Sequence, residues 1–328
     1  MVAIVNTLME NPHTLLQLDP WMPEYEGSVE IDPAEASVAG IDCTVEYPEW
    51  KAVDQSHPRA LPTFYFIDGV RRTDARVMAW SPGGLIHGLL GTTASGAVRS
   101  KGSDATFDRC EVCRFLILGG GHKRSEVMTI GESKVEFVGV ASISSAPADL
   151  GGELQELMRQ LEARVAESLI GSENLVFIDG PLAYISSLGA VVGVIKRISQ
   201  PYLDTGRFAL VTSLGVGQRT PLFLISDGKR DRYSWYLRIG ERRHFDHVLT
   251  GIVRLEVRAV AGLETAKQLA TLSAGSLVRF ASTAMRDPRA PQNLVPIGAL
   301  ETELRRRMGD SLIVRRAIEK RISEGVEL

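Results

Sequence analysis

The chain has little of the residue types that mark secreted or membrane proteins. Its 328 residues include 3 cysteines, which is too few and an odd number for a disulfide framework. No apolar run reaches the roughly 18 residues that a membrane-spanning helix needs. The first residues also lack the basic-then-apolar order of a signal peptide. Together these absences predict a soluble, cytoplasmic protein.

An excess of one charge is also missing. The 37 basic residues nearly balance the 40 acidic residues, and the net charge is −3. This balance excludes a uniformly basic surface, so any contact with nucleic acid must come from local basic patches. Hydrophobic residues make up 44% of the chain, which is enough for a large core.

Two regions differ in composition. Residues 1–60 are rich in acidic residues and in prolines that interrupt periodic elements, so they predict an irregular N-terminal arm. Residues 61–328 predict one folded domain that ends in a basic helical segment. The prolines of the arm are Pro12, Pro20, Pro23, Pro33, Pro48 and Pro58.

The domain opens with strands. The apolar run Thr63 to Ile67, closed by Asp68 and Gly69, is typical of a buried strand. Gly-rich turns separate most of the runs that follow, which favours hairpins. These strand-like runs are Ala75 to Trp80, Leu85 to Leu90, Cys113 to Leu118, Glu126 to Ile130 and Lys134 to Ala141.

The apolar period then changes. Apolar residues from Leu154 to Leu169 recur at three and four residues, which predicts an amphipathic helix. Directly after it, Leu175 to Ile178 repeats the apolar strand and ends in Asp179. Hairpins, a crossover helix and then a central strand predict an α/β fold with a mixed sheet.

The last third of the chain continues this alternation. Gly189 to Ile195 predicts a buried segment that ends in Lys196. Further strands are predicted at Phe208 to Thr212, Pro221 to Ile225 and Ser234 to Ile239. Helices are predicted at Leu263 to Leu272 and at Leu300 to Ile322, and the second of these is strongly basic.

Two carboxylates stand out because Asp68 and Asp179 both occur in the phrase Phe-Ile-Asp-Gly. An aspartate that leaves a buried strand before a flexible glycine can present a hard oxygen ligand to a divalent cation. An aspartate that merely opens a turn is the alternative for either residue alone. The repetition favours a two-metal site of the kind that cleaves phosphodiesters.

Two further residues suit such a site. Glu162 lies on the margin of the apolar stripe of the predicted helix, which makes it the best third carboxylate, although a boundary glutamate paired with Arg159 is an equal alternative. Lys196 follows another strand and could reach a phosphate oxygen, with a surface lysine as the alternative.

Basic residues that could contact nucleic acid are Arg71 and Arg72, just after Asp68, and Arg286 and Arg289. Such groups neutralise phosphates and would steer a strand toward an acidic pocket. The arginines of the basic tail are more typical of a solvated helix face. Trp235 and Tyr236 could stack on bases, although core packing is the commoner role.

These phrases, in this order, resemble the NurA family of DNA-repair nucleases, in its bacterial type, from about residue 60 to the end. The residues that carry the resemblance are Phe66-Ile67-Asp68-Gly69, Arg159 with Leu161-Glu162, Phe177-Ile178-Asp179-Gly180-Pro181-Leu182, Gly193-Val194-Ile195-Lys196, Ser234-Trp235-Tyr236-Leu237-Arg238 and the segment from Arg286 to Ile297.

The resemblance implies an RNase H-like core with Asp68, Glu162 and Asp179 as ligands of Mn2+, with Mg2+ as the alternative and two ions in the site. It also implies a DNA exonuclease and single-strand endonuclease, a ring-shaped homodimer, and a hexameric HerA-type translocase as partner in end resection at double-strand breaks.

One departure concerns the fourth site residue. Archaeal members of that family carry a histidine after an alanine near the carboxy terminus, whereas Ala299 is followed here by Leu300. Glu301 or Asp310 could take its place, or the position could be empty. The alternative functions are a non-catalytic DNA clamp or adaptor docked on a translocase, and a phosphatase or nucleotide hydrolase on the same fold.

Overall fold

The computed structural model describes residues 17–18, 40–54, 62–81, 84–186, 189–198, 201–228, 230–244, 246–283, 285–286 and 290–325. Most of the predicted arm at residues 1–60 therefore lies outside the described residues. The described part, residues 40–54, lies against the edge of the sheet, where Glu46 pairs with Arg219 at 2.8 Å. Both side chains are at most 3% exposed, so this part of the chain belongs to the folded core.

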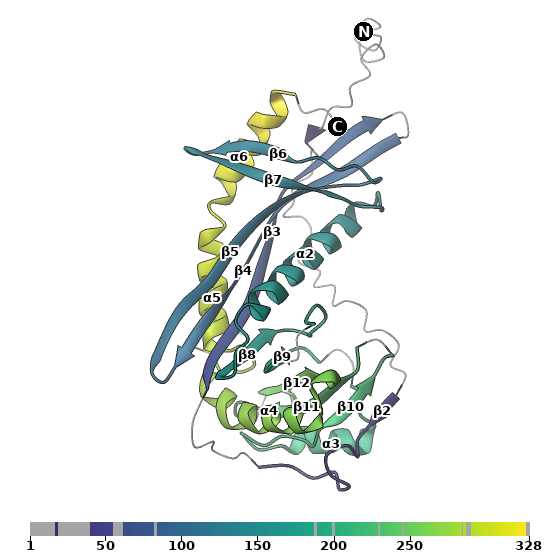
Figure 1. The fold of residues 1–328 in the computed structure, drawn as a ribbon, viewed down its shortest axis with the longest axis vertical. Helices are drawn as coiled ribbons and strands as arrows, with labels where there is room; N and C mark the ends of the chain where they lie inside the picture. Colours follow the sequence, from purple (N-terminus) through teal and green to yellow (C-terminus); the bar gives the residue numbers. More distant parts are fainter. Residues whose placement is uncertain are drawn as a thin grey trace, which may run out of the picture.

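One mixed sheet of twelve strands organises the described part of the chain (Figure 1). Its strand order is β2-β10-β11-β12-β9-β8-β3-β4-β5-β7-β6, and β1 pairs with β3 outside this path. The strands are β1 (Gln17–Leu18), β2 (Gly40–Asp42), β3 (Thr63–Ser81), β4 (Gly84–Lys101), β5 (Asp104–Leu118), β6 (Glu126–Ile130), β7 (Ser133–Ala141), β8 (Asn174–Asp179), β9 (Val191–Ile195), β10 (Phe223–Ser226), β11 (Arg232–Arg238) and β12 (Ile252–Arg258).

The centre of the sheet has an RNase H-like topology. The strands β3, β4 and β5 pair in antiparallel fashion, and β8 then joins β3 in parallel after the crossover helix α2 (Pro147–Glu167). The strand β9 adds to β8, also in parallel. The predicted α/β fold with a mixed sheet and flanking helices is confirmed.

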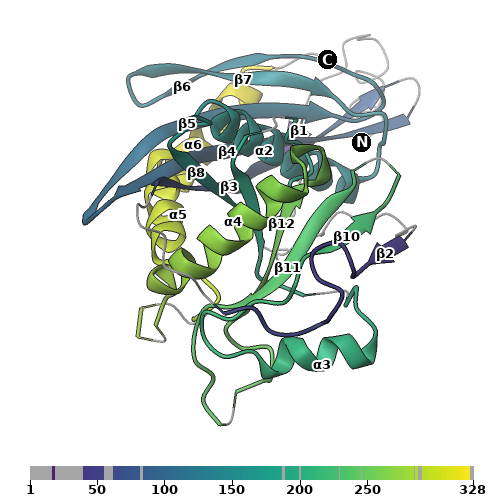
Figure 2. The same cartoon turned by 60° about the horizontal axis from the view of Figure 1, so that its bottom comes forward.

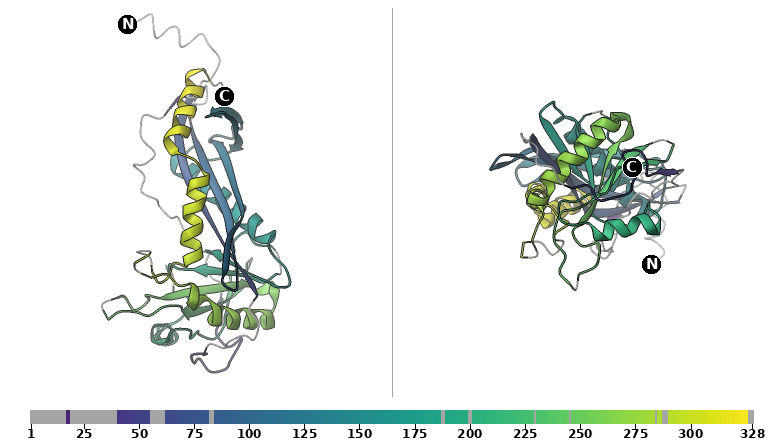
Figure 3. Two further views of the ribbon diagram at one scale, coloured as in Figure 1. Left: turned by 90° about the vertical axis from the view of Figure 1, so that its left-hand side faces the viewer. Right: turned by 90° about the horizontal axis from the view of Figure 1, so that it is seen from below.

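Helices cover both faces of the sheet (Figures 1 and 2). Alternate residues of β3 point to opposite faces, so Tyr65 and Ile67 pack with α2 while Phe64 and Phe66 pack with α4 and α5. The helices α5 and α6 run along one face of the long strands (Figure 3). The helices other than α2 are α3 (Thr205–Ser213), α4 (Leu263–Ser276), α5 (Val295–Arg307) and α6 (Ser311–Ser323), with short 3-10 turns η2 (Ala259–Ala261) and η3 (Leu277–Phe280).

Several sequence predictions need correction. The strand predicted to end at Asp68 continues through Gly69, so Thr63 to Ile67 and Ala75 to Trp80 are parts of one strand, β3. Phe208 to Thr212 is helical, because Asp204 caps α3 by accepting a hydrogen bond from the Arg207 amide. The predicted tail helix is two helices, which Gly309 separates in a left-handed conformation with φ of +79°.

An aromatic cluster fixes the junction of β3 and β8. Phe66 stacks on Phe177 across the two strands with ring centroids 5.5 Å apart, and Phe280 meets Phe66 edge-on at 4.7 Å. Each such pair contributes about 0.5–1.5 kcal/mol beyond its buried area. Asp68 and Asp179 follow these phenylalanines by two residues, so the cluster holds their two strands in register.

Within the described ranges, no helix has the combination of length and apolar character that a membrane span requires.

Candidate metal centre

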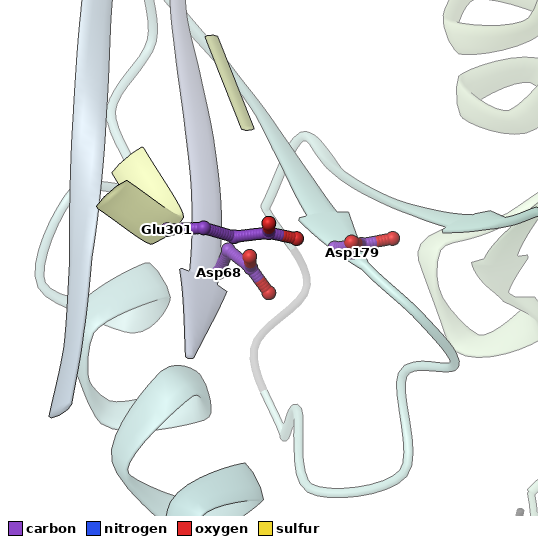
Figure 4. A group of neighbouring side chains, drawn as sticks. All are labelled: Asp68, Asp179 and Glu301. Atoms are coloured by element: carbon purple, nitrogen blue, oxygen red, sulfur yellow. The ribbon is translucent and has the colours of Figure 1, made fainter. Parts of the chain in front are cut away.

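Three carboxylates meet beside the point where β8 ends (Figure 4). Asp68 comes from β3, Asp179 is the last residue of β8, and Glu301 reaches in from α5. One oxygen atom of each lies within 4.8 Å of the others. We call these three residues the carboxylate cluster. The parallel pairing of β3 and β8 explains the first two positions, since Ile67 lies opposite Ile178.

Asp68 is the most deeply placed member of the cluster, with 6% of its surface exposed. Burial is the main reason that the pKa of its carboxyl lies well above the ordinary value, and the charges of Asp179 and Glu162 raise the pKa further. Lys196 opposes the shift. A bound cation would offset this electrostatic cost and would stabilise the ionised form of the carboxylates.

Glu162 approaches the cluster from α2 and is 2% exposed. Its Oε2 accepts a hydrogen bond from Arg159 Nη1 at 2.9 Å, so the ion pair considered from the sequence is present. Burial raises the pKa of Glu162 although Arg159 acts against the shift. Its Oε1 is buried with no hydrogen-bond partner among the described residues, which leaves one oxygen available to a ligand.

The two glycines of the repeated phrase are needed for different reasons. A Cβ atom on Gly69 would lie 2.7 Å from Glu162 Oε1, so only glycine lets the glutamate approach β3. Gly180 has φ of +114°, and a Cβ there would lie 2.9 Å from Arg159 Nη1. The same arginine donates to the Asp179 carbonyl at 2.8 Å. Both glycines therefore make room for the Arg159–Glu162 pair.

Lys196 links two elements at the site. Its Nζ lies 2.5 Å from Asp179 Oδ2 and 2.5 Å from Oδ1 of the buried Asn293, just before α5. The lysine side chain is 19% exposed, so the alternative considered from the sequence, an exposed surface lysine, does not apply. It lies next to one of the two aspartates, and its contact with a phosphate stays a prediction.

The helix α5 is anchored at both ends, which fixes Glu301. The Lys196–Asn293 bond holds its beginning, and at its end Arg72 and Arg114 donate to the Met308 carbonyl. Of the two sequence candidates for a fourth carboxylate, the structure brings Glu301 to the cluster. Asp310 is exposed and caps α6 through the amides of Leu312 and Ile313.

Two of the predicted nucleic-acid contacts lie on opposite faces of the sheet. Arg71 and Arg72 alternate across β3, so Arg71 bonds Gln155 of α2 while Arg72 pairs with Asp74 and bonds the Gly309 carbonyl at the end of α5. Arg286 is exposed, and Arg289 lies outside the described residues.

The aromatic pair Trp235 and Tyr236 is fully buried in the core. This agrees with the commoner role that the sequence analysis gave them. In this structure they cannot stack on a base.

The donor set fits a hard divalent cation. Mg2+ and Mn2+ favour carboxylate oxygens, and the cluster supplies three of them with Glu162 adjacent. The partnerless Oε1 of Glu162 and the raised pKa of Asp68 are further marks of a site that a cation would stabilise. These residues are held by two strands and two helices, so little reordering would be needed on binding.

Comparisons with known proteins add structural similarity at low sequence identity. No protein-family model matches the chain, and no curated protein matches it. The crystal structure of the NurA nuclease from Sulfolobus solfataricus is similar over 79% of this chain and 84% of that chain, with 10% identity and a TM-score of 0.45. Structures of NurA bound to dAMP and manganese and of NurA with manganese match 40% of this chain and 22% of theirs, with TM-scores of 0.21 and 0.20 and identities of 15% and 16%.

Proposed function

We propose that this protein is a metal-dependent deoxyribonuclease. The observation that supports the proposal most strongly is the carboxylate cluster at the junction of β3 and β8, with oxygen atoms of Asp68, Asp179 and Glu301 within 4.8 Å of one another. Enzymes that hydrolyse phosphodiesters use such carboxylates to hold a pair of divalent ions. Manganese is the ion proposed, two per site, with magnesium as the alternative.

The residues of the site have separate roles in this proposal. Asp68 and Asp179 hold the ions, Glu301 closes the cluster from α5, and Glu162 offers its free Oε1. A bound divalent cation supplies Lewis-acid polarisation of the phosphate and a more acidic water nucleophile. Lys196, next to Asp179, stabilises negative charge on the phosphate, and Arg159 keeps Glu162 oriented.

The choice of DNA as substrate follows the sequence resemblance to the NurA nucleases. The same resemblance supports exonuclease and single-strand endonuclease activity, a homodimer, and a HerA-type translocase as partner in end resection. Arg71 and Arg286 remain candidates for phosphate contacts in this proposal, and so does Arg289.

A cleavage assay tests the proposal. Labelled single-stranded and double-stranded DNA are incubated with the purified protein and Mn2+, with and without a HerA-type translocase. We expect the wild type to degrade DNA and Asp68→Ala and Asp179→Ala to be inactive. Asp310→Asn is the control, because it changes a carboxylate on the α6 cap and not in the cluster. If Asp68→Ala degrades DNA as fast as the wild type, the proposal fails.

A second candidate function is a non-catalytic DNA clamp or adaptor on a translocase. One observation favours it: Arg159 and Lys196 already pair with Glu162 and Asp179, as they would in a purely structural network. In that case Asp68→Ala leaves DNA handling by the complex with its translocase unchanged, and Mn2+ has no effect on the thermal stability of the protein.

A further inference from the structure

The segment that follows Asp179 is fixed at several points. Leu182 and Ile185 are buried at 4% and 3% exposure and pack with α2. The Leu182 amide donates to Glu256 at 3.0 Å, and the Ile185 carbonyl accepts from Arg258 at 3.2 Å. Figure 4 shows this segment leaving the end of β8 at Asp179. The chain next to the carboxylate cluster is therefore preorganised.

Between these anchors the segment presents Tyr184, which is half-buried. Its hydroxyl lies next to Glu156 of α2, one helical turn from Arg159. Arg159 in turn contacts both Glu162 and the Asp179 carbonyl. Tyr184 therefore lies on the side of the sheet that α2 covers, five residues after Asp179.

A cation lies over the same ring. The guanidinium carbon of Arg230 is 5.9 Å from the centroid of Tyr184, and Arg230 is exposed. The backbone amide of Arg230 donates to Asp227 Oδ1 at 2.5 Å, so the backbone of Arg230 is also held. An aromatic ring and a planar guanidinium are the two side-chain groups on which unpaired nucleobases stack.

We propose that Tyr184 and Arg230 form a stacking platform for one unpaired base of a single strand whose phosphate lies at the carboxylate cluster. This inference rests on the proposed nuclease function and identifies the side chains that recognise the single strand. Glu156 beside the Tyr184 hydroxyl favours an uncharged base over a phosphate at this position, because a carboxylate repels phosphate. Base stacking tolerates any sequence, so the platform would select single strands without selecting a sequence.

The test uses single-stranded oligonucleotides with 2-aminopurine at successive positions, bound to the full-length protein with Ca2+ in place of Mn2+. We expect quenching of the fluorescence at one position and a loss of affinity of about 5- to 140-fold in Tyr184→Ala, the range that stacking on one base gives. Tyr184→Phe and Tyr184→Trp keep the ring and should bind like the wild type. Tyr47→Ala is the matched control, since Tyr47 is 45% exposed and lies in the segment that follows the edge strand β2.

An oligonucleotide with an abasic site at the quenched position separates stacking from a structural effect. The wild type should lose affinity for it, while Tyr184→Ala should bind it as weakly as it binds the intact strand. Equal affinity of Tyr184→Ala and Tyr184→Phe for the intact strand overturns the platform. If the wild type still cleaves DNA with Mn2+ in that case, the nuclease proposal stands, whereas a wild type that neither binds nor cleaves DNA overturns both.

Discussion

Asp68→Asn should stabilise the protein when no divalent cation is present. The side chain is buried, and the neighbouring carboxylates of Asp179, Glu162 and Glu301 act on it, so its charge is costly in the folded state. Asparagine has almost the same shape and carries no charge. The substitution therefore removes the repulsion and leaves the packing of β3 against β4 and β8 intact.

The size of the effect follows from the geometry of the cluster. Two like charges 4.8 Å apart in a medium of effective dielectric near 20 repel by about 3.5 kcal/mol. Asp68 has two such neighbours in the cluster, and Lys196 offsets part of their effect. We expect a net gain of roughly 2–4 kcal/mol in the free energy of unfolding, or roughly 3–6 °C in Tm for a chain of this length.

The gain should depend on pH. Burial and neighbouring carboxylates raise the pKa of Asp68 in the folded state above the value of 3.8 that it has when unfolded. The folded wild type therefore holds a proton that the unfolded chain has lost, so its stability falls as pH rises above 3.8. The difference between Asp68→Asn and the wild type should be smallest near pH 4 and largest at neutral pH.

Thermal unfolding in EDTA and in Mn2+ measures both effects. Mn2+ should raise the Tm of the wild type by mass action and should raise that of Asp68→Asn much less. Asp310→Asn is the control, because asparagine caps a helix as well as aspartate and Asp310 lies outside the cluster. If Asp68→Asn is less stable than the wild type in EDTA at neutral pH, the reasoning about charge at this site is refuted.

Three further outcomes are expected. Glu301→Gln should raise the Mn2+ concentration for half-maximal DNA cleavage by about tenfold or more, while Glu303→Gln, two residues further along α5, should leave it unchanged. Gly69→Ala should lower the free energy of unfolding by about 1–3 kcal/mol and reduce cleavage, because the new Cβ would meet Glu162 Oε1. Gly151→Ala in α2 is the control: the space around its Cβ is open, so it should raise the free energy of unfolding by about 0.5–1 kcal/mol. Urea unfolding measures both changes. Arg219→Met should lower the free energy of unfolding by about 3–5 kcal/mol, because it leaves Glu46 buried without its cation. Adding Glu46→Leu should recover most of that stability. A double variant no more stable than the single one would contradict this explanation.

The sequence predicted the centre of the fold because the signals there are local. Apolar runs that end in Asp68 and Asp179, separated by hairpins and an amphipathic helix, were enough to predict the mixed sheet and to pair the two aspartates. The length of β3 was not predictable from these signals. Gly69 is typical of a strand end, yet the strand continues because Gly69 pairs with Ser95 of β4 and leaves space for Glu162.

Glu301 and Tyr184 depend on long-range contacts that no local pattern reveals. Glu301 reaches the cluster because Arg72, Arg114 and Lys196 anchor α5 from distant strands. The sequence offered it only as one of two candidates in place of a missing histidine. The segment that carries Tyr184 is fixed by partners on β12 through Leu182 and Ile185, and Tyr184 has no motif of its own.

The central claim is that the carboxylate cluster binds a divalent cation, and anomalous scattering from crystals soaked in Mn2+ tests it most directly. We expect at least one anomalous peak bounded by Asp68, Asp179 and Glu301 in the wild type, and no peak there in Asp68→Ala. A wild-type map with no peak between these carboxylates, at Mn2+ concentrations that support cleavage, would contradict the claim.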